Sequence, residues 1–140
     1  MDALYTAEAL AQGAGRNGSV ATQDGSLKFD LAVPKEMGGT GNGANPEQLF
    51  AAGYAACFHS ALQMVARQQK ASLGDSAVGA RVQIGSNGEG GFGLAVQLEV
   101  VIPDMEQDRA QELADAAHQV CPYSNATRGN IEVTVTVVDE

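Results

Sequence analysis

The sequence predicts an α+β domain in which helices pack on a mostly antiparallel sheet, with elements in the order β-β-β-α-β-β-α-β. Three observations support this class. Short alternating segments separated by turn residues fill the first third, two long segments have helical composition, and the segment Ile131–Val138 alternates as a strand does. The length of 140 residues fits a single domain covering residues 1–140.

The first third is expected to form a small β-meander. The expected strands are Leu4–Ala11, Ser19–Gln23 and Leu27–Val33, and Pro34 ends the last of them. The pair Asn17-Gly18 is typical of a tight turn between strands.

A long helix is expected from Pro46 to about Lys70. Asn45 suits the N-cap, Pro46 suits the first helical position, and Gln48 can close a capping box with Asn45. The stretch Leu49–Leu62 is apolar on nearly every helical face, so this helix should lie in the core.

Two strands, Val78–Gly85 and Phe92–Ile102, are expected to form a hairpin. A second helix should follow, capped by Asp104 with Gln107 as its box partner. Pro122 should end that helix at or just after Cys121.

Composition and charge exclude several classes of function. The net charge of −9, with only eight Lys and Arg residues, argues against binding to nucleic acid or to an anionic membrane. The N-terminus has no basic segment followed by an apolar stretch, and the run Leu49–Leu62 is too short to span a membrane, so we expect a cytoplasmic protein. Aromatic residues are only 5%, which favours a dimer that completes the core.

The chain has two cysteines, Cys57 in the apolar run and Cys121 before a proline. Thiols in the cytoplasm are normally kept reduced, so a cysteine pair there is more often catalytic or redox-sensing than a structural disulfide. Either thiol alone would ordinarily be a small buried hydrophobe, because chemistry needs a stabilised thiolate.

Two other kinds of site use the same residue types. A zinc site would need both histidines, yet His59 and Cys57 point in very different directions on a helix. A hydrolase could pair Cys57 with His118, but no oxyanion-hole signature accompanies it and Cys121 is left without a role. Both remain possible and both are disfavoured.

A peroxide-reducing cycle uses both cysteines and needs neither a metal nor an organic cofactor. A low-pKa thiolate attacks the peroxide and becomes a sulfenic acid, which a second thiol converts to a disulfide for an external dithiol to reduce. Lowering a thiol pKa by about two units means about 2.7 kcal/mol of thiolate stabilisation, which one well-placed arginine can supply.

Two long motifs resemble the organic hydroperoxide resistance proteins, the Ohr branch of the OsmC family. They are Asn45–Phe58, NPEQLFAAGYAACF, and His118–Asn130, HQVCPYSNATRGN. The resemblance runs almost end to end. It implies an OsmC-like fold, an intertwined homodimer with active sites at the subunit interface, and a thiol peroxidase that reduces organic hydroperoxides to alcohols. It also implies a lipoyl-bearing protein or another dithiol as the reductant and fatty-acid-derived peroxides as substrates.

The same resemblance implies the roles of four residues. Cys57 is expected to be the peroxidatic cysteine and Cys121 the resolving one, with Arg16 as the catalytic arginine and Glu47 as the carboxylate that orients it. The one departure noted is Ala14 before Gly15-Arg16, where the family commonly has a second glycine.

Helical geometry adds a further expectation. Glu47 and Cys57 would lie about 15 Å apart along a straight helix, too far for Arg16 to contact both. We therefore expect the helix to break near Gly53 and to place Cys57 in the first turn of a new helix. Phe50 and Phe58 are expected to line an apolar substrate channel. The alternative to catalysis is a dimeric module that binds an apolar ligand and senses oxidation without turnover.

Overall fold

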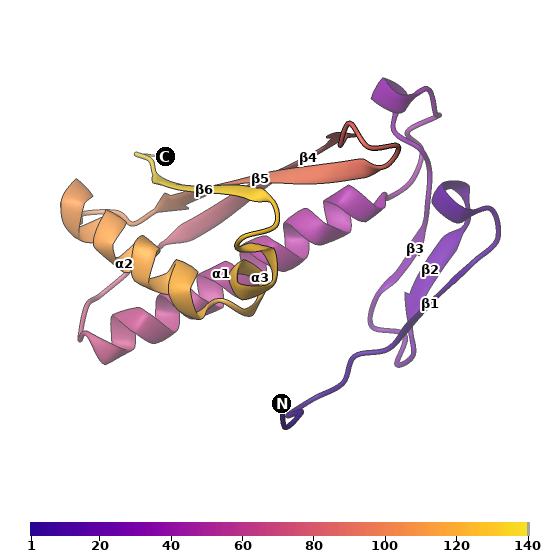
Figure 1. Cartoon of the computed structure of the whole chain (residues 1–140). Coiled ribbons are helices and arrows are strands. Elements are labelled where there is room, and N and C mark those ends of the chain that lie inside the picture. The colour runs from indigo at the N-terminus through magenta and orange to yellow at the C-terminus, as the bar shows by residue number, and fades with distance from the viewer. Residues whose placement is uncertain (140) are drawn as a thin grey trace. The chain divides into compact units, whose positions relative to one another are not determined.

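The computed structural model describes residues 1–139, which divide into two compact units, Met1–Leu49 and the chain from Phe50 onward. Each unit contains one three-stranded sheet. The expected order of strands and long helices is confirmed, and a short third helix follows the second long one (Figure 1).

The first unit is built around an antiparallel meander of β1 (Ala9–Gln12), β2 (Ser19–Thr22) and β3 (Lys28–Asp30). The predicted meander is confirmed, but β1 starts later than the expected Leu4. Its ladder runs from Ala9 opposite Thr22 to Gln12 opposite Ser19, so the four residues of β2 limit its length. Within the described chain, the only buried hydrophobic side chain of this unit is Ala32.

Helix α1 spans Pro46–Gln68 without interruption. The capping box is confirmed, because the Gln48 N–H donates to Asn45 Oδ1 at 2.9 Å and the Asn45 N–H donates to Gln48 Oε1 at 3.0 Å. The predicted break near Gly53 is wrong. A glycine in mid-helix costs only about 1 kcal/mol, which the packing of the buried side chains of α1 outweighs. The helix therefore continues through Gly53, and Cys57 lies in mid-helix and gains nothing from a helix N-terminus.

By length and composition alone α1 could span a membrane, since 23 residues include a window of mean hydropathy 1.3. The apolar run Leu49–Leu62 is itself shorter than a membrane span, and the helix continues past it to Gln68 with polar residues. One third of that window is buried, and its buried side chains, among them Phe58 and Leu62, belong to the hydrophobic core of the second unit.

The sheet of the second unit has the order β4-β5-β6. Strands β4 (Ala77–Ser86) and β5 (Phe92–Val101) form the predicted hairpin, and β6 (Glu132–Val137) pairs with β5 in parallel. The expectation of mostly antiparallel pairing is confirmed, because three of the four strand pairs are antiparallel and only the β5-β6 pair is parallel in the described chain. The connection from β5 to β6 carries two helices, and a crossover of that length allows parallel pairing.

Helix α2 spans Gln107–Val120, and its cap differs from the prediction. Glu106 is the N-cap and accepts a hydrogen bond from the Asp108 N–H, whereas Asp104 has a positive φ of 60° before the helix begins. Gln107 instead donates to the Val137 carbonyl oxygen at 3.1 Å. With Gln111, which bonds Val135 and Val137, it satisfies the outer edge of β6.

Helix α3 (Pro122–Thr127) was not predicted. Pro122 does end α2 as expected, but it also occupies the first position of α3, where proline is favoured. The core of the second unit lies between the sheet and helices α1 and α2, which cover the same face (Figure 1). Its fully buried large side chains come from α1, β5 and α2: Tyr54, Phe58, Leu62, Val96, Leu98, Val100 and Leu113.

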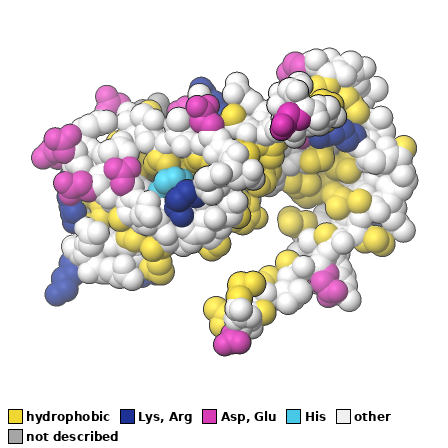
Figure 2. Space-filling model, in the orientation of Figure 1, with side chains coloured by type: hydrophobic (Ala, Val, Ile, Leu, Met, Phe, Trp, Pro, Cys, Tyr) yellow, Lys and Arg dark blue, Asp and Glu magenta, His cyan; other side chains and the backbone are white. Residues whose placement is uncertain are grey.

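Acidic side chains gather around α2 on the outer surface of the second unit (Figure 2). This placement agrees with the net charge of −9 and gives the helix a solvated face.

Candidate active site

The two cysteines meet in the second unit. Cys57 lies in the middle of α1 and is half-buried, whereas Cys121 joins α2 to α3 and is fully buried. Their Sγ atoms are 3.5 Å apart, and both are free thiols. A disulfide bond is about 2.05 Å long, so a small movement of one side chain brings the sulfurs to bonding distance.

The surroundings of Cys57 within this unit do not favour its thiolate. Burial raises the pKa of the Cys57 thiol, and the neighbouring Cys121 raises it further, while the backbone N–H of Tyr123 lowers it. The net direction is upward, so these groups alone leave Cys57 a poor nucleophile. None of these three influences is a cation, so a Cys57 thiolate would need one from another group.

Arg16 and Glu47 form a two-point ion pair in the first unit. Arg16 Nη1 donates to Glu47 Oε2 at 2.8 Å, and Nη2 donates to Oε1 at 2.7 Å. The Arg16 hydrogen bond holds the pKa of the Glu47 carboxyl below its usual range, and the carboxylate raises the pKa of Arg16. One third of the Arg16 side chain is exposed, so its charge remains available to another group.

A tight turn between β1 and β2 presents Arg16. The turn contains a short 3₁₀ segment, Gly15–Asn17, in place of a two-residue hairpin turn. A Cβ on Gly18 would lie 2.1 Å from the Gln12 carbonyl oxygen, so only glycine lets the two strands close there. Ala14 has a negative φ of −95°, so this position does not need the left-handed backbone that favours glycine.

Three aromatic rings pack together near Cys57. The ring of Tyr54 lies 5.9 Å from Phe50 and 5.6 Å from Tyr123, measured between centroids. Tyr123 also packs against Gly53, where an added Cβ would lie 2.9 Å from its hydroxyl. Phe58 is fully buried in the core, so the expectation that it lines a channel was wrong.

The histidines have other partners. His59 Nε2 is hydrogen-bonded to Ser76 Oγ at 2.9 Å, and His118 Nδ1 to Ser124 Oγ at 2.7 Å. Ser124 and Tyr123 were not among the site residues predicted from the sequence. Their position directly after Cys121-Pro122 was the available signal, because a proline-started helix turn brings such residues back beside the cysteine.

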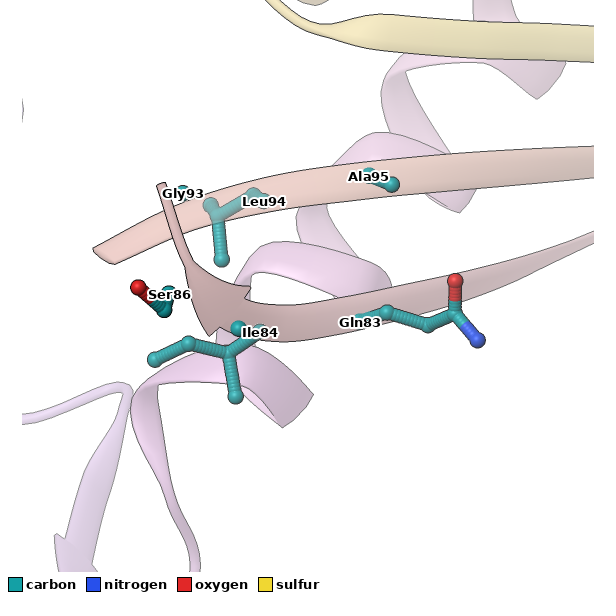
Figure 3. A pocket seen from close by; sticks show the side chains of 7 residues that line it. Gln83, Ile84, Ser86, Gly93, Leu94 and Ala95 are labelled. Atoms are coloured by element: carbon teal, nitrogen blue, oxygen red, sulfur yellow. The ribbon is translucent and has the colours of Figure 1, made fainter. Parts of the chain in front are cut away.

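A hollow of about 420 Å³ lies at the turn end of the β4-β5 hairpin, with Gln83, Ile84 and Leu94 among its lining residues (Figure 3). Neither cysteine lines it. Its lining combines the polar side chains of Gln83 and Ser86 with small or apolar residues, and it includes no acidic, basic or thiol side chain.

The sequence of this chain is similar to that of known proteins. The family model described as OsmC-like protein matches residues 39–136, a span that includes Glu47, Cys57 and Cys121. An organic hydroperoxide resistance protein of Xanthomonas axonopodis pv. citri (strain 306) is 53% identical over 136 residues, covering 96% of this chain and 94% of its own length. The chain belongs to the organic hydroperoxide resistance branch of the OsmC family.

Solved structures of the family agree with the fold. The organic hydroperoxide resistance protein of Legionella pneumophila superposes with a TM-score of 0.93 at 54% identity, covering 97% of this chain and 98% of that one. OhrB of Bacillus subtilis superposes with a TM-score of 0.87 at 46% identity, covering 97% and 100%. The family and the OsmC-like α+β fold predicted from the sequence are therefore confirmed.

The four predicted site residues are found as two pairs, Arg16 with Glu47 and Cys57 with Cys121. Their individual roles and the dimer remain predictions.

Proposed function

We propose that this protein is a cysteine-based peroxidase that reduces organic hydroperoxides to alcohols and protects against oxidative stress. The observation that carries the proposal is the pair of free thiols, Cys57 and Cys121, with sulfurs 3.5 Å apart at the junction of α1, α2 and α3. Relatives at about half identity are named for organic hydroperoxide resistance, which supports the same substrate class. We propose that the whole of residues 1–140 works as a single domain.

In the first step the Cys57 thiolate attacks the distal oxygen of the hydroperoxide. A sulfur–oxygen bond forms, the oxygen–oxygen bond breaks, and the alkoxide leaves and takes a proton to become the alcohol. Cys57 is then a sulfenic acid, oxidised by two electrons.

In the second step the Cys121 sulfur attacks the Cys57 sulfur and forms a disulfide. The sulfenic oxygen leaves as hydroxide and takes up the proton released by Cys121, so the product is water. An external dithiol, which we propose to be a lipoyl-bearing protein, returns both cysteines to thiols by two exchange steps. The cycle consumes no metal and no organic cofactor.

The thiolate needs a cation, because burial raises the pKa of Cys57. We propose that Arg16 supplies it and that Glu47 orients the guanidinium through the two-point ion pair. On an uninterrupted α1, Glu47 and Cys57 lie about 15 Å apart along one helix axis. Therefore we propose that the Arg16–Glu47 pair of one protomer serves Cys57 of its partner in a homodimer.

The exposed hydrophobic residues of the first unit support a dimer. Leu4, Tyr5 and Leu10 are largely or fully exposed, and Ala32 is the only buried hydrophobic residue of that unit in the described chain. A 49-residue segment with so little core is not expected to be stable by itself. A second copy that covers these side chains would complete its core.

The aromatic cluster next to Cys57 supports an apolar substrate. Phe50 and Tyr123 offer ring surface beside the thiol, which favours alkyl and fatty-acid hydroperoxides over hydrogen peroxide. We further propose that the protein works in the cytoplasm, where thiol reductants are available.

Steady-state peroxide consumption tests the proposal. The wild type should turn over cumene hydroperoxide with dihydrolipoamide, and glutathione should support much less turnover. Cys57→Ser should abolish consumption, since Cys121, the other thiol, is fully buried and out of reach of the peroxide. Cys121→Ser should stall or slow dihydrolipoamide-driven cycling after the first oxidation.

The same assay separates catalysis from sensing. A redox-sensing module would consume one equivalent of peroxide per thiol pair and then stop, even with dithiol in excess. Equal consumption by the wild type and both variants would contradict the proposal.

A further inference from the structure

Four polar side chains form a hydrogen-bonded network in the second unit, three of them buried and the fourth, His118, half-buried. Ser124 Oγ lies 2.7 Å from His118 Nδ1 and 2.9 Å from the Tyr54 hydroxyl, and that hydroxyl lies 3.1 Å from Thr127 Oγ1. Tyr54 and Ser124 have no exposed surface, and Thr127 is 5% exposed. Buried polar groups are costly unless every one is hydrogen-bonded, and this network satisfies its members.

The network encloses the segment that carries Cys121. Cys121 is both the C-cap of α2 and the N-cap of α3, and its backbone is extended, with a ψ of 123°. His118 precedes it by three residues and Ser124 follows it by three. The hydrogen bond between those two side chains therefore bridges the bend and fixes the angle at which Cys121 leaves α2.

A second link ties this bend to the helix that carries Cys57. Tyr54 precedes Cys57 by three residues on α1, so the two lie on neighbouring positions of one helix face. The Tyr54 hydroxyl bonds Ser124 and Thr127, both on the far side of the bend. The hydroxyls thus connect the backbones of both cysteines without touching either sulfur atom.

We propose that Tyr54, Ser124 and His118 are positioning residues that set the rate at which Cys121 closes the disulfide with oxidised Cys57. This inference rests on the proposed peroxidase function. In the step concerned the Cys121 sulfur bonds to the Cys57 sulfur, the sulfur–oxygen bond of the sulfenic acid breaks, and hydroxide leaves with the proton from Cys121 as water. The network does not take part in the first step, the attack of Cys57 on the peroxide.

The reason is geometric. The 3.5 Å between the sulfurs must shorten to about 2.05 Å along a defined line of attack. A misplacement of about 1 Å can cost a reaction roughly 100-fold. Apolar residues of similar size would pack in this core, but they would leave the bend free to settle in several arrangements.

The experiment separates the two steps in a single turnover. Reduced full-length protein is mixed with one equivalent of cumene hydroperoxide. Peroxide loss reports the first step, and acid-quenched thiol counting by mass spectrometry reports disulfide closure. Tyr54→Phe and Ser124→Ala should consume peroxide within about twofold of the wild-type rate and close the disulfide about 10-fold more slowly. Dimedone should trap more sulfenic acid in both variants.

A matched control removes a similar bond elsewhere on α1. Ser76→Ala deletes the hydroxyl that bonds His59, and it should change neither rate. His118→Asn keeps a hydrogen-bonding group near the position of Nδ1 and should close the disulfide nearly as fast as the wild type, whereas His118→Leu should be slow. This pair provides the answer if Ser124→Ala does not fold.

Three results would overturn the inference. Equal closure rates in wild type, Tyr54→Phe and His118→Leu would show that the network does not position Cys121. A first step slowed as much as closure would show a general effect on the fold. If the wild type consumes no peroxide, the proposed function fails and this inference fails with it.

Discussion

The hydroxyl of Tyr123 occupies the space that a side chain at Gly53 would need, since a Cβ there would lie 2.9 Å from that oxygen. The two residues are 70 positions apart in the sequence and belong to α1 and α3. Gly53 is therefore a packing site within a continuous helix, and the close approach holds α3, with its neighbour Cys121, against α1.

Replacing Gly53 tests this contact. At a solvent-exposed helix position, a change from glycine to alanine increases the free energy of unfolding by about 1 kcal/mol. At Gly53 the new methyl group would displace Tyr123. We expect Gly53→Ala to be less favourable by about 1 kcal/mol in the wild type than in Tyr123→Phe, which lacks the hydroxyl. Urea unfolding of the four proteins under reducing conditions measures the difference. If the two substitutions have additive effects on the free energy of unfolding, the Tyr123 hydroxyl does not restrict the side chain at position 53.

The Arg16–Glu47 pair should matter more for activity than for stability. Glu47→Gln removes the charge that orients the guanidinium and should lower kcat/KM for cumene hydroperoxide about 10-fold to 100-fold. The free energy of unfolding should fall by only about 1 kcal/mol, because the pair is partly exposed. Glu99→Gln breaks the exposed Arg81–Glu99 pair and serves as the matched control. A similar activity loss in that variant would contradict the assigned role.

His118 should make stability depend on pH. Burial, and then the charge of Arg128, lower the pKa of His118, so the folded protein binds its proton less readily than the unfolded chain does. Its stabilising contribution is fully present above the unfolded pKa of about 6.5 and is lost as the pH falls through the folded pKa. The urea concentration at the unfolding midpoint of the reduced protein should decrease as the pH is lowered from about 7 to about 5. His118→Gln should flatten that fall, and an unchanged slope would argue against it.

Mixed dimers test which protomer supplies the arginine. Arg16→Ala and Cys57→Ser should each be nearly inactive as homodimers. Co-expressed in equal amounts, they should recover about one quarter of the wild-type sites, because half of the dimers are mixed and each mixed dimer has one intact site. Isolated mixed dimers with no activity would show that Arg16 acts within its own chain.

Local signals were sufficient to predict much of the fold. The Asn45–Gln48 box, the proline at the end of α2 and the alternation of β4, β5 and β6 all depend on residues close in the sequence. Each of these elements is found where the pattern predicted it, within a few residues at the ends.

Features that depend on distant contacts could not be predicted in the same way. The helix break was predicted because Arg16 cannot contact both Glu47 and Cys57 of one straight helix, and Gly53 was its expected place because glycine is costly in a helix. The contact of Gly53 with Tyr123 appears only after folding. The parallel pairing of β6 and the use of Gln107 at the edge of that strand likewise depend on tertiary structure. The raised pKa of Cys57 follows from burial, which no spacing rule indicates.

The candidate site was predicted by residue type and resemblance, and the structure adds its geometry. The sequence motifs identified Cys57 and Cys121 as a pair, and their sulfurs do lie 3.5 Å apart. The position of Ser124 just after Cys121-Pro122 indicated that it lies near the cysteine, but nothing in the motifs indicated its hydrogen-bond partners. Its position inside a buried network required the bend at Cys121 and the approach of Tyr54.

Intact mass of the reduced protein after one equivalent of cumene hydroperoxide tests the two-cysteine cycle in one step. We expect both thiols to disappear together, peptide mapping to find a Cys57–Cys121 disulfide within a single chain, and one equivalent of alcohol to form. Alcohol formed while Cys121 remains a free thiol, or both thiols intact with the peroxide unconsumed, would contradict it.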